Sequence, residues 1–258
     1  MTDSRPTMTS ARSRMGSSRL GGVPTRLADA DERAPETLAL DFGARPRARH
    51  DVMPGVVLIT GWLDTEQQRS LVDGFRRWSL PPAGLRHPRV PSGHLMTVQS
   101  VCLGWHWQPY AYSRTADDTD GAPVKPIPSD LVELARRAVG DTFGTEAGTR
   151  YAPDAVIANL YTDDAKLGLH QDGEEPSDAP VVTISLGDTC DFRMAGVDRR
   201  TAPFADLQLH SGDLLVFGGP SRRIYHGVPR VHPGTGPRDI GLPPGRLSIT
   251  VRETGLAG

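Results

Sequence analysis

The chain has 258 residues, which is enough for one domain with a sizeable buried core and an additional tail. Basic and acidic residues nearly cancel, and the formal net charge of −2 at pH 7 gives no general indication of nucleic-acid binding. Any contacts with phosphate groups must therefore come from local basic patches. No apolar run is long enough to cross a bilayer, so no membrane association is expected.

The first 36 residues are polar and rich in residues that interrupt helices. This segment has few acids and carries basic residues at Arg5, Arg12, Arg14, Arg19 and Arg26. Organelle transit peptides are also rich in Arg and Ser, but Pro6, Gly16 and Pro24 interrupt any amphipathic helix here. We predict a disordered Arg/Ser-rich tail over residues 1–36, with weak, salt-sensitive affinity for phosphates, and a single domain over residues 37–258.

Two helices are expected in the first half of the domain. After a strand at residues 57–60, Asp64 can cap a helix whose apolar residues share one face and which ends before Pro81. The second helix begins near Ser129 and has Gly140 near its end. Both helices have one apolar stripe, so each is expected to pack on a neighbouring layer.

The stretch between the helices, about residues 80–125, is rich in loops and aromatic residues. An aromatic cluster of this kind forms either part of a core or a stacking surface, and its members are Trp105, Tyr110 and Tyr112. Arg86 and Arg89 either contact phosphates or are surface arginines without a function. Both alternatives are open from the sequence.

Cys102 and Cys190 lie in segments that read as strands or their margins. They form no CxxC pair, and two cysteines do not make a disulfide framework. Buried free thiols are therefore expected, with a reducing cytoplasm as the setting.

From about residue 154 the pattern changes to short strands separated by turn signals. The expected strands cover residues 156–161, 166–171, 181–186, 207–209, 214–217 and 247–251. Several short strands at this spacing predict a sandwich or barrel, with the two helices packed on its outside. The fold class is therefore α+β with a mainly β core over about residues 154–252.

The last expected strand alternates strictly between polar and apolar residues. Period two places its polar residues on one face: Arg246, Ser248, Thr250 and Arg252. A strand with one face in solvent would look the same. The other interpretation is that the two arginines face inward and bind a carboxylate, which a guanidinium can hold in a defined orientation.

His170, Asp172 and His226 form a candidate metal site. In an extended strand alternate side chains share a face, so His170 and Asp172 can approach one ion from the same side. Two histidines and one carboxylate leave three coordination positions of an octahedral ion open, as in non-haem Fe(II) oxygenases. An H-x-D pattern alone is common by chance, and a single histidine is more often structural, so the neighbouring segments have to support the interpretation.

Taken together, these segments resemble the AlkB family of Fe(II)/2-oxoglutarate-dependent dioxygenases, most closely its bacterial DNA-repair members. The resemblance extends from about Val56 to Arg252 and is densest from Asn159 onward. The matching segments are Asn159-Leu160-Tyr161, Ala165 to Asp172, Glu175-Pro176, Ala179 to Val182, Ser185 to Gly187, Ser211 to Asp213, Gly218 to Arg222, Tyr225 to Gly227 and Arg246 to Arg252. So many motifs in one order are hard to obtain by chance.

The resemblance implies a double-stranded β-helix, a cupin-like jelly-roll, with flanking helices and an N-terminal nucleotide-recognition lid over about residues 80–125. It implies Fe(II) as the metal, with His170, Asp172 and His226 as ligands. It also implies 2-oxoglutarate and O2 as cosubstrates, with 2-oxoglutarate contacting Asn159, Tyr161, Arg246, Ser248 and Arg252.

The implied function is oxidative demethylation of N-alkylated nucleobases such as 1-methyladenine and 3-methylcytosine, that is, alkylation repair. The products are formaldehyde, succinate and CO2, and the partner is alkylated DNA or RNA. Such a methyl group lies on the base-pairing edge, so the base must be unpaired or flipped out. The residues that match substrate contacts of the family are Trp105, Tyr110, Tyr112, Glu174 and Arg199. A cytoplasmic monomer is expected.

Three positions depart from the family pattern: Glu174 stands for the usual Asp, Phe217 for Trp and Ser248 for Asn. Glu174 affects the expected substrate preference, Phe217 one packing contact and Ser248 one cosubstrate hydrogen bond. None of the three is a metal ligand. Two other functions remain open. One is a 2-oxoglutarate oxygenase that acts on a protein or small molecule, and the other is a non-enzymatic cupin-like binding module.

Overall fold

The computed structural model describes residues 45–162 and 164–256 as two facing β-sheets with helices on the outside. The larger, seven-stranded sheet is antiparallel, in the order β1 (Ala48–Met53), β2 (Val56–Thr60), β11 (Leu214–Phe217), β8 (Val181–Gly187), β13 (Arg246–Arg252), β6 (Ala155–Tyr161) and β3 (Gln99–Leu103). The four-stranded sheet has the order β10 (Ala205–Leu209), β9 (Cys190–Met194), β12 (His226–Val231) and β7 (Leu167–His170). A separate hairpin consists of β4 (His106–Gln108) and β5 (Ala111–Ser113).

The two sheets enclose an apolar cluster between them. Phe192, Met194 and Val228 of the smaller sheet pack in one cluster with Val181 and Phe217 of the larger sheet. This pair of facing antiparallel sheets is the jelly-roll arrangement, so the predicted fold class is confirmed. The space between the sheets is where inward-facing side chains of both sheets meet.

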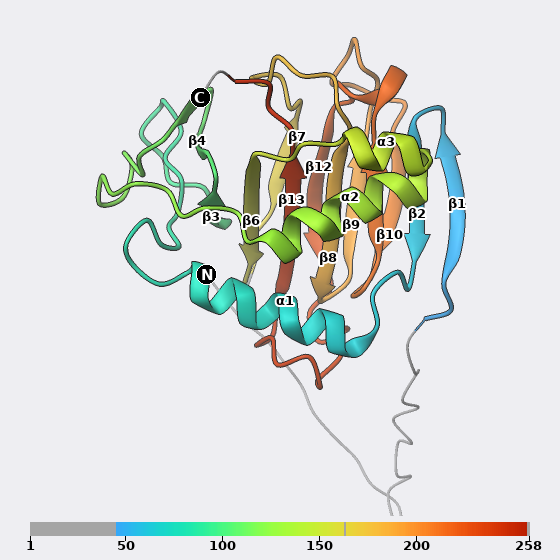
Figure 1. Ribbon diagram of the computed structural model, residues 1–258, viewed down its shortest axis with the longest axis horizontal. Helices are drawn as coiled ribbons and strands as arrows, with labels where there is room; N and C mark the ends of the chain where they lie inside the picture. The colour runs from blue at the N-terminus through green and yellow to red at the C-terminus, as the bar shows by residue number, and fades with distance from the viewer. Residues whose placement is uncertain (1–44, 163, 257–258) are drawn as a thin grey trace, which may run out of the picture. The chain divides into compact units, whose positions relative to one another are not determined.

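A second apolar cluster lies on the outer face of the larger sheet. Figure 1 shows α1 (Thr65–Trp78) and α2 (Ser129–Phe143) lying across this face. Phe75 of α1 and Leu131 of α2 are buried in one cluster with Val182 and Ile249 of the sheet. The prediction that the helices pack outside the β core is confirmed.

The helix boundaries follow local signals in the sequence. The Asp64 side chain caps α1 by accepting a hydrogen bond from the Gln67 backbone N–H, and the Gln67 side-chain oxygen accepts one from the Asp64 backbone N–H, which is a capping box. The helix α2 continues past Gly140 and ends at Gly144, which has a φ of 97° that favours glycine. The short α3 (Thr145–Arg150) follows, and the sequence did not predict it.

Every residue of β13 is buried, although its sequence alternates between polar and apolar. Leu247, Ile249 and Val251 face the helices and belong to the outer cluster. The polar set therefore faces the smaller sheet, and the alternative of a solvent-exposed face is excluded. In this set Arg246 lies opposite Tyr161 of β6, and Ser248 lies opposite Asn159.

Several strands were missed by the sequence analysis. The strand β3 lies inside the predicted loop-rich stretch, and its Val101-Cys102-Leu103 run is buried on both faces, so it shows no alternation. The strand β12 contains Gly227 and Pro229, which are unfavourable in strand interiors. The hairpin β4–β5 and the strands β1 and β9 were not predicted either.

The predicted tail at residues 1–36 lies outside the described residues, so the division into tail and domain stays a prediction. Both cysteines are buried free thiols, as expected, with Cys102 in β3 and Cys190 in β9. Within the described ranges, no helix combines the length and apolar character needed to cross a membrane.

Candidate metal centre and cosubstrate pocket

The structure brings His170, Asp172 and His226 together at one edge of the smaller sheet. His170 is the last residue of β7 and His226 the first of β12, and the two are directly paired in the antiparallel register. Asp172 lies two residues beyond the end of β7, so it belongs to the following loop. The sequence-based prediction that His170 and Asp172 share one face of a strand is therefore wrong for Asp172. One ligand atom from each residue lies within 4.8 Å of the others.

Backbone carbonyls orient both histidine rings. The Nδ1 of His170 lies 3.1 Å from the carbonyl oxygen of Gly168, and the Nδ1 of His226 lies 3.0 Å from that of Ile224. Because a carbonyl oxygen only accepts, each Nδ1 carries the proton, and the Nε2 lone pair is free to bind a metal. Asp172 contributes a carboxylate oxygen 3.7 Å from the Nε2 of His170.

The electrostatic surroundings favour the metal-binding protonation states. Although burial disfavours its charge, the Arg252 guanidinium and the two histidines hold the pKa of the Asp172 carboxyl well below its usual range. Burial lowers the pKa of His226 to about 4, and His170 acts in the same direction. Near neutral pH the site therefore presents a carboxylate and a neutral imidazole, which are the forms that coordinate a divalent ion.

Aromatic rings cover the His226 side of the site. The ring of Phe217 lies 4.9 Å from the ring of His226, and the ring of Phe192 lies 5.6 Å from it. Phe217, the residue that departs from the family's tryptophan, therefore still supplies an aromatic contact to a candidate ligand. The two rings cover the His226 side of the site. On the other side, the half-exposed His170 leaves the site partly open.

Arg246 is fully buried between the sheets and, among the described residues, has no acidic partner. Its guanidinium carbon lies 5.0 Å from the centroid of the Tyr161 ring, and burial raises the pKa of Tyr161 to about 12. Across the described part of the chain, none of its three guanidinium nitrogens has a hydrogen-bond partner, and the same holds for Ser185 Oγ and Arg252 Nη1. Burying an unpaired charge is unfavourable, so these donors fit an absent anionic group that accepts hydrogen bonds.

A row of small polar residues lies beside Arg246 on the inward face of the larger sheet. Ser248 of β13 is directly opposite Asn159 of β6 on one side and Ser185 of β8 on the other. Ser100 of β3 continues the row and donates a hydrogen bond to Asn159 Oδ1 at 2.6 Å. Ser100 and Ser185 were not predicted as site residues, although Ser185 lies in the segment Ser185 to Gly187 that matches the family pattern. A dicarboxylate would meet the Arg246 guanidinium and this polar row in one pocket.

Arg252, at the other end of β13, is already occupied. Its Nε and Nη2 lie 2.9 and 2.8 Å from Asp172 Oδ2, and its Nε lies 3.5 Å from Glu175 Oε1. The two arginines of β13 therefore differ: Arg246 is free to bind an anion, whereas Arg252 mainly holds a candidate metal ligand.

The predicted substrate residues of the lid lie in different surroundings. Trp105 is 8% exposed, its indole donates to Asp154, and Arg114 covers one face of the ring at 3.5 Å. Tyr110, at the tip of the hairpin, is 75% exposed. Tyr112 is half-buried, and its hydroxyl donates to Glu175 Oε1 at 2.5 Å.

The remaining predicted substrate residues, Glu174 and Arg199, are both accessible to solvent. Glu174 is half-exposed and, among the described residues, has no hydrogen-bond or ion-pair partner. Arg199 is exposed in the β9–β10 connection. Arg86 is buried and pairs with Asp118, so it is a structural residue, whereas Arg89 is exposed.

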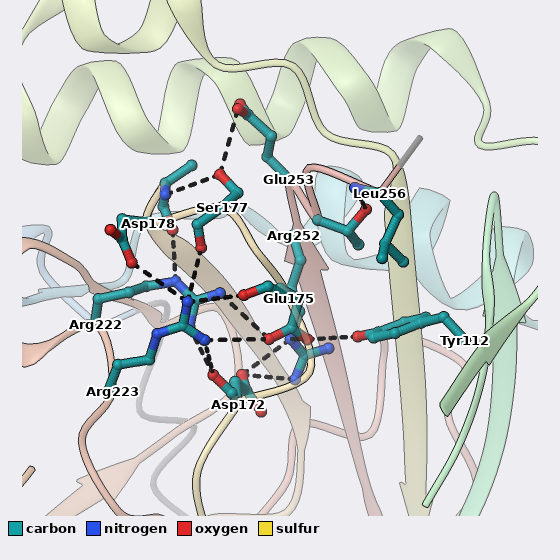
Figure 2. A network of polar contacts seen from close by, with 12 residues as sticks. Tyr112, Asp172, Glu175, Ser177, Asp178, Arg222, Arg223, Arg252, Glu253 and Leu256 are labelled. Carbon is teal, nitrogen blue, oxygen red and sulfur yellow. Dashed lines mark hydrogen bonds and ion pairs between the residues drawn. The ribbon is translucent and has the colours of Figure 1, made fainter. Parts of the chain in front are cut away.

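Glu175, which follows Glu174, is a residue whose importance the sequence analysis did not recognise. Its side chain is 1% exposed and lies among Arg222, Arg252 and Tyr112, as Figure 2 shows. The adjacent acids of the Glu174-Glu175-Pro176 segment were the available signal, but the sequence does not tell which of them is buried.

Comparisons with known proteins identify the family. Residues 55–252 match the model of the 2OG-Fe(II) oxygenase superfamily. The Escherichia coli (strain K12) protein "Alpha-ketoglutarate-dependent dioxygenase AlkB" is 38% identical, and the match covers 64% of this chain and 76% of that protein. The chain belongs to the AlkB family. Fe(II), 2-oxoglutarate and dioxygen are the metal and cosubstrates of this family, in agreement with the donor set described above.

Two further comparisons relate this AlkB-family chain to plant proteins. It is 34% identical to the Arabidopsis thaliana protein "DNA N(6)-methyladenine demethylase ALKBH1D", with 80% of this chain covered. It spans about half the length of that relative, 51%. The solved structure "The structure of OsALKBH1" matches with a TM-score of 0.72 and 31% identity, over 80% of this chain and 100% of that one.

Proposed function

We propose that this AlkB-family protein removes alkyl groups from N-alkylated nucleobases by oxidation, in an Fe(II)- and 2-oxoglutarate-dependent reaction. The observation that carries the proposal is the buried guanidinium of Arg246, whose three nitrogens lack partners within the described ranges. It lies on the same inward face of β13 as Arg252, which binds Asp172 of the His-Asp-His cluster. An anion pocket next to a metal site fits a cosubstrate that is a dicarboxylate.

The metal in this proposal is held by His170, Asp172 and His226. Their role is supported by their mutual approach and by the two Nδ1–carbonyl contacts that leave both Nε2 atoms available. Arg252 keeps the Asp172 carboxylate oriented through Oδ2, so that Oδ1 is left for the metal.

The cosubstrate 2-oxoglutarate is bound by Arg246 through its distal carboxylate, with hydrogen bonds from Asn159, Tyr161 and Ser248. The raised pKa of Tyr161, caused by burial, keeps its phenol protonated and able to donate. Arg252 lies toward the metal-bound end and has its Nη1 available. Ser185, with an unpartnered hydroxyl on the same face, is a further candidate for this pocket.

The chemistry supplied by bound Fe(II), 2-oxoglutarate and dioxygen is hydroxylation of an N-methyl carbon, after which formaldehyde leaves and succinate and CO2 are the other products. The protein itself contributes binding and orientation. Arg246 fixes the cosubstrate, and Phe192 and Phe217 keep water from the His226 side of the metal site.

Recognition of the alkylated base is assigned to residues at the open side of the site. A base flipped out of its stack can contact Tyr110 and Tyr112, whereas Trp105 is buried beneath Arg114. An N-methylated cationic base is attracted to the carboxylate of Glu174, which has no partner among the described residues. The exposed Arg199 is suited to contact a phosphate. The name of the Arabidopsis relative, a DNA N(6)-methyladenine demethylase, supports DNA as the substrate.

The same proposal includes RNA as a second substrate, a monomeric state and a cytoplasmic location. Two buried free thiols are consistent with a reducing compartment. It also includes the lid at about residues 80–125, the β core at about 154–252 and a tail at 1–36, as the sequence predicts.

The test is a demethylation panel with Fe(II) and 2-oxoglutarate on single-stranded DNA, duplex DNA and RNA oligonucleotides that carry 1-methyladenine or 3-methylcytosine. Formaldehyde and succinate release are measured, with methylated peptides as the control substrates. We expect release with oligonucleotides. Activity on peptides alone would show that the nucleic-acid part of the proposal is wrong, whereas metal binding without succinate production would indicate a binding module.

The variant Glu174→Asp, measured in the same panel, tests the role of Glu174. Shortening the side chain by one methylene withdraws the carboxylate from the base, so we expect the ratio of kcat/KM values for the two lesions to change by about tenfold, as for one charge-assisted hydrogen bond. An unchanged ratio would exclude Glu174 from base recognition.

A further inference from the structure

Glu175 occupies a buried position between the lid hairpin and the metal centre. It follows the metal-ligand loop directly, three residues after Asp172, and its side chain is 1% exposed. Figure 2 shows Tyr112 approaching it from the hairpin side and Arg222 and Arg223 from the opposite side. Neither metal coordination nor cosubstrate binding, as proposed above, uses this carboxylate.

The contacts of Glu175 form a continuous chain from the lid to a metal ligand. The hydroxyl of Tyr112, in β5 of the hairpin, donates to Glu175 Oε1 at 2.5 Å. The same oxygen lies 3.5 Å from Arg252 Nε. Arg252 in turn holds Asp172 Oδ2 with contacts of 2.9 and 2.8 Å. Three polar contacts therefore separate the hairpin from the metal-ligating carboxylate.

Other contacts keep Glu175 in place without involving the hairpin. Its Oε2 lies 3.4 Å from Arg222 Nη2, and the Arg222 and Arg223 side chains also donate to the backbone carbonyl of Asp172, at 3.1 and 2.8 Å. The loop from Asp172 to Glu175 is thus held as a unit. Because Arg222 neutralises Glu175 independently, the Tyr112 bond is not required for charge balance.

The hairpin also has polar contacts with Arg86, Cys102 and Asp118, none of which lies in the loop that follows β7. Among the described residues of β4 and β5, Tyr112 is the one whose side chain hydrogen-bonds to the loop that follows β7. Burial raises the pKa of Tyr112 far above its usual range, so the phenol keeps its proton and remains a donor. Glu175 Oε1 accepts this bond, and it also faces the Arg252 guanidinium at 3.5 Å.

We propose that Glu175 is a positioning residue that couples the lid hairpin to the metal centre. Binding of metal at Asp172 fixes Arg252, which fixes Glu175 Oε1 as an acceptor for Tyr112, and so orders the hairpin. Coupling of binding is reciprocal, so an occupied lid strengthens metal binding by the same factor. The inference rests on the proposed metal and cosubstrate site and is independent of which nucleic acid is the substrate.

The experiment is hydrogen–deuterium exchange of the full chain, with and without Mn²⁺ plus 2-oxoglutarate and without nucleic acid. In the wild type we expect ligands to slow exchange at residues 167–172 and, by about tenfold, in the hairpin at residues 106–113, as for one hydrogen bond to a charged group. Tyr112→Phe and Glu175→Gln should keep the slowing at residues 167–172 and lose it in the hairpin.

The matched control is Asp178→Asn, which also converts an acid of this network to its amide. Asp178 is 88% exposed and contacts Arg223 but neither Tyr112 nor Arg252. It should retain the wild-type slowing in the hairpin. Tyr112→Phe keeps the ring and the Arg222 pair, so it decides the question even if Glu175→Gln does not fold.

The inference would be overturned by hairpin slowing that persists in Tyr112→Phe, or by hairpin slowing that Asp178→Asn abolishes as well. Hairpin exchange that ligands leave unchanged in the wild type, while residues 167–172 are slowed, would also overturn it. If Mn²⁺ slows neither segment, the proposed metal site itself is wrong.

Discussion

The two arginines of β13 show how the same residue type takes opposite roles within one strand. Arg252 is buried against Asp172 and Glu175, so it neutralises the Asp172 carboxylate and shares Glu175 with Arg222. Arg246 is fully buried and has no partner in the described ranges. The first arginine stabilises the ligand-free fold, whereas the second disfavours it and fits the anion that we propose to bind there.

Replacing each arginine by methionine should therefore change stability in opposite directions. Arg252→Met leaves the buried Asp172 carboxylate without its arginine partner, whereas Glu175 keeps Arg222. We expect a loss of about 3–5 kcal/mol in the free energy of unfolding of the ligand-free protein. Arg246→Met removes an unpaired buried charge, so the same quantity should stay equal or increase. Urea unfolding of both variants measures these values.

The cosubstrate affinity separates the two roles further. Arg246→Met should raise the Kd for 2-oxoglutarate by about 100-fold, measured by calorimetry with Mn²⁺, because a charge-assisted bond is lost. An Arg246→Met variant that is destabilised like Arg252→Met but binds 2-oxoglutarate normally would contradict this assignment.

At the scale of elements, the metal site depends on how closely β7 and β12 approach. His170 and His226 are directly paired across these strands, with ring centroids 4.4 Å apart. Gly227, next to His226, makes the approach possible, since a Cβ atom there would lie 2.7 Å from the carbonyl oxygen of Leu167 and 2.9 Å from that of Gly168. Real side chains do not tolerate such distances to backbone atoms.

Gly227→Ala should push the two strands apart and separate the histidines. We expect the Kd for Mn²⁺ to rise at least about tenfold and the protein to be destabilised by about 1–3 kcal/mol, the usual cost of overpacking. Gly173→Ala is the matched control, because Gly173 adjoins Asp172 but a Cβ there meets nothing within 4 Å. Equal metal affinity of the two variants would show that the close approach at Gly227 is not needed.

At the scale of the whole molecule, the described residues contain two apolar clusters that account for a stable fold. One lies between the sheets and the other between the larger sheet and the helices α1 and α2. Among the described residues before Val56, Val52 and Met53 pack partly against the cluster between the sheets. The tail predicted at residues 1–36 lies outside the described residues, and we expect it to bind phosphates.

Deleting residues 1–36 should leave the Tm unchanged and reduce the salt dependence of binding to single-stranded DNA. Each lost phosphate contact lowers the slope of log K against log salt by about 0.7. Fluorescence anisotropy at several salt concentrations measures the slope. As a control, lysine at Arg5, Arg12, Arg14, Arg19 and Arg26 keeps the charge of the tail and should keep the slope. An unaltered slope after the deletion would exclude a role of the tail in DNA binding.

Local patterns in the sequence were sufficient for much of the fold and for the cluster of His170, Asp172 and His226. The capping signal at Asp64, the apolar stripes of both helices and the alternation of residues 246–252 depend on neighbours along the chain, and the structure confirms each of them. The same holds for the fold class, since short strands with turn signals indicate a β core without any knowledge of their pairing.

Only the tertiary structure decided which of these residues are paired and which are free. That Arg252 holds Asp172 while Arg246 remains unpartnered, and that Glu175 rather than Glu174 is buried, depends on residues brought together from distant parts of the chain. The strands β3 and β12 were missed for a related reason, because pairing with β6 and β9 outweighs their unfavourable local sequence. Residue types and spacing are local properties, whereas burial and partner choice are properties of the folded chain.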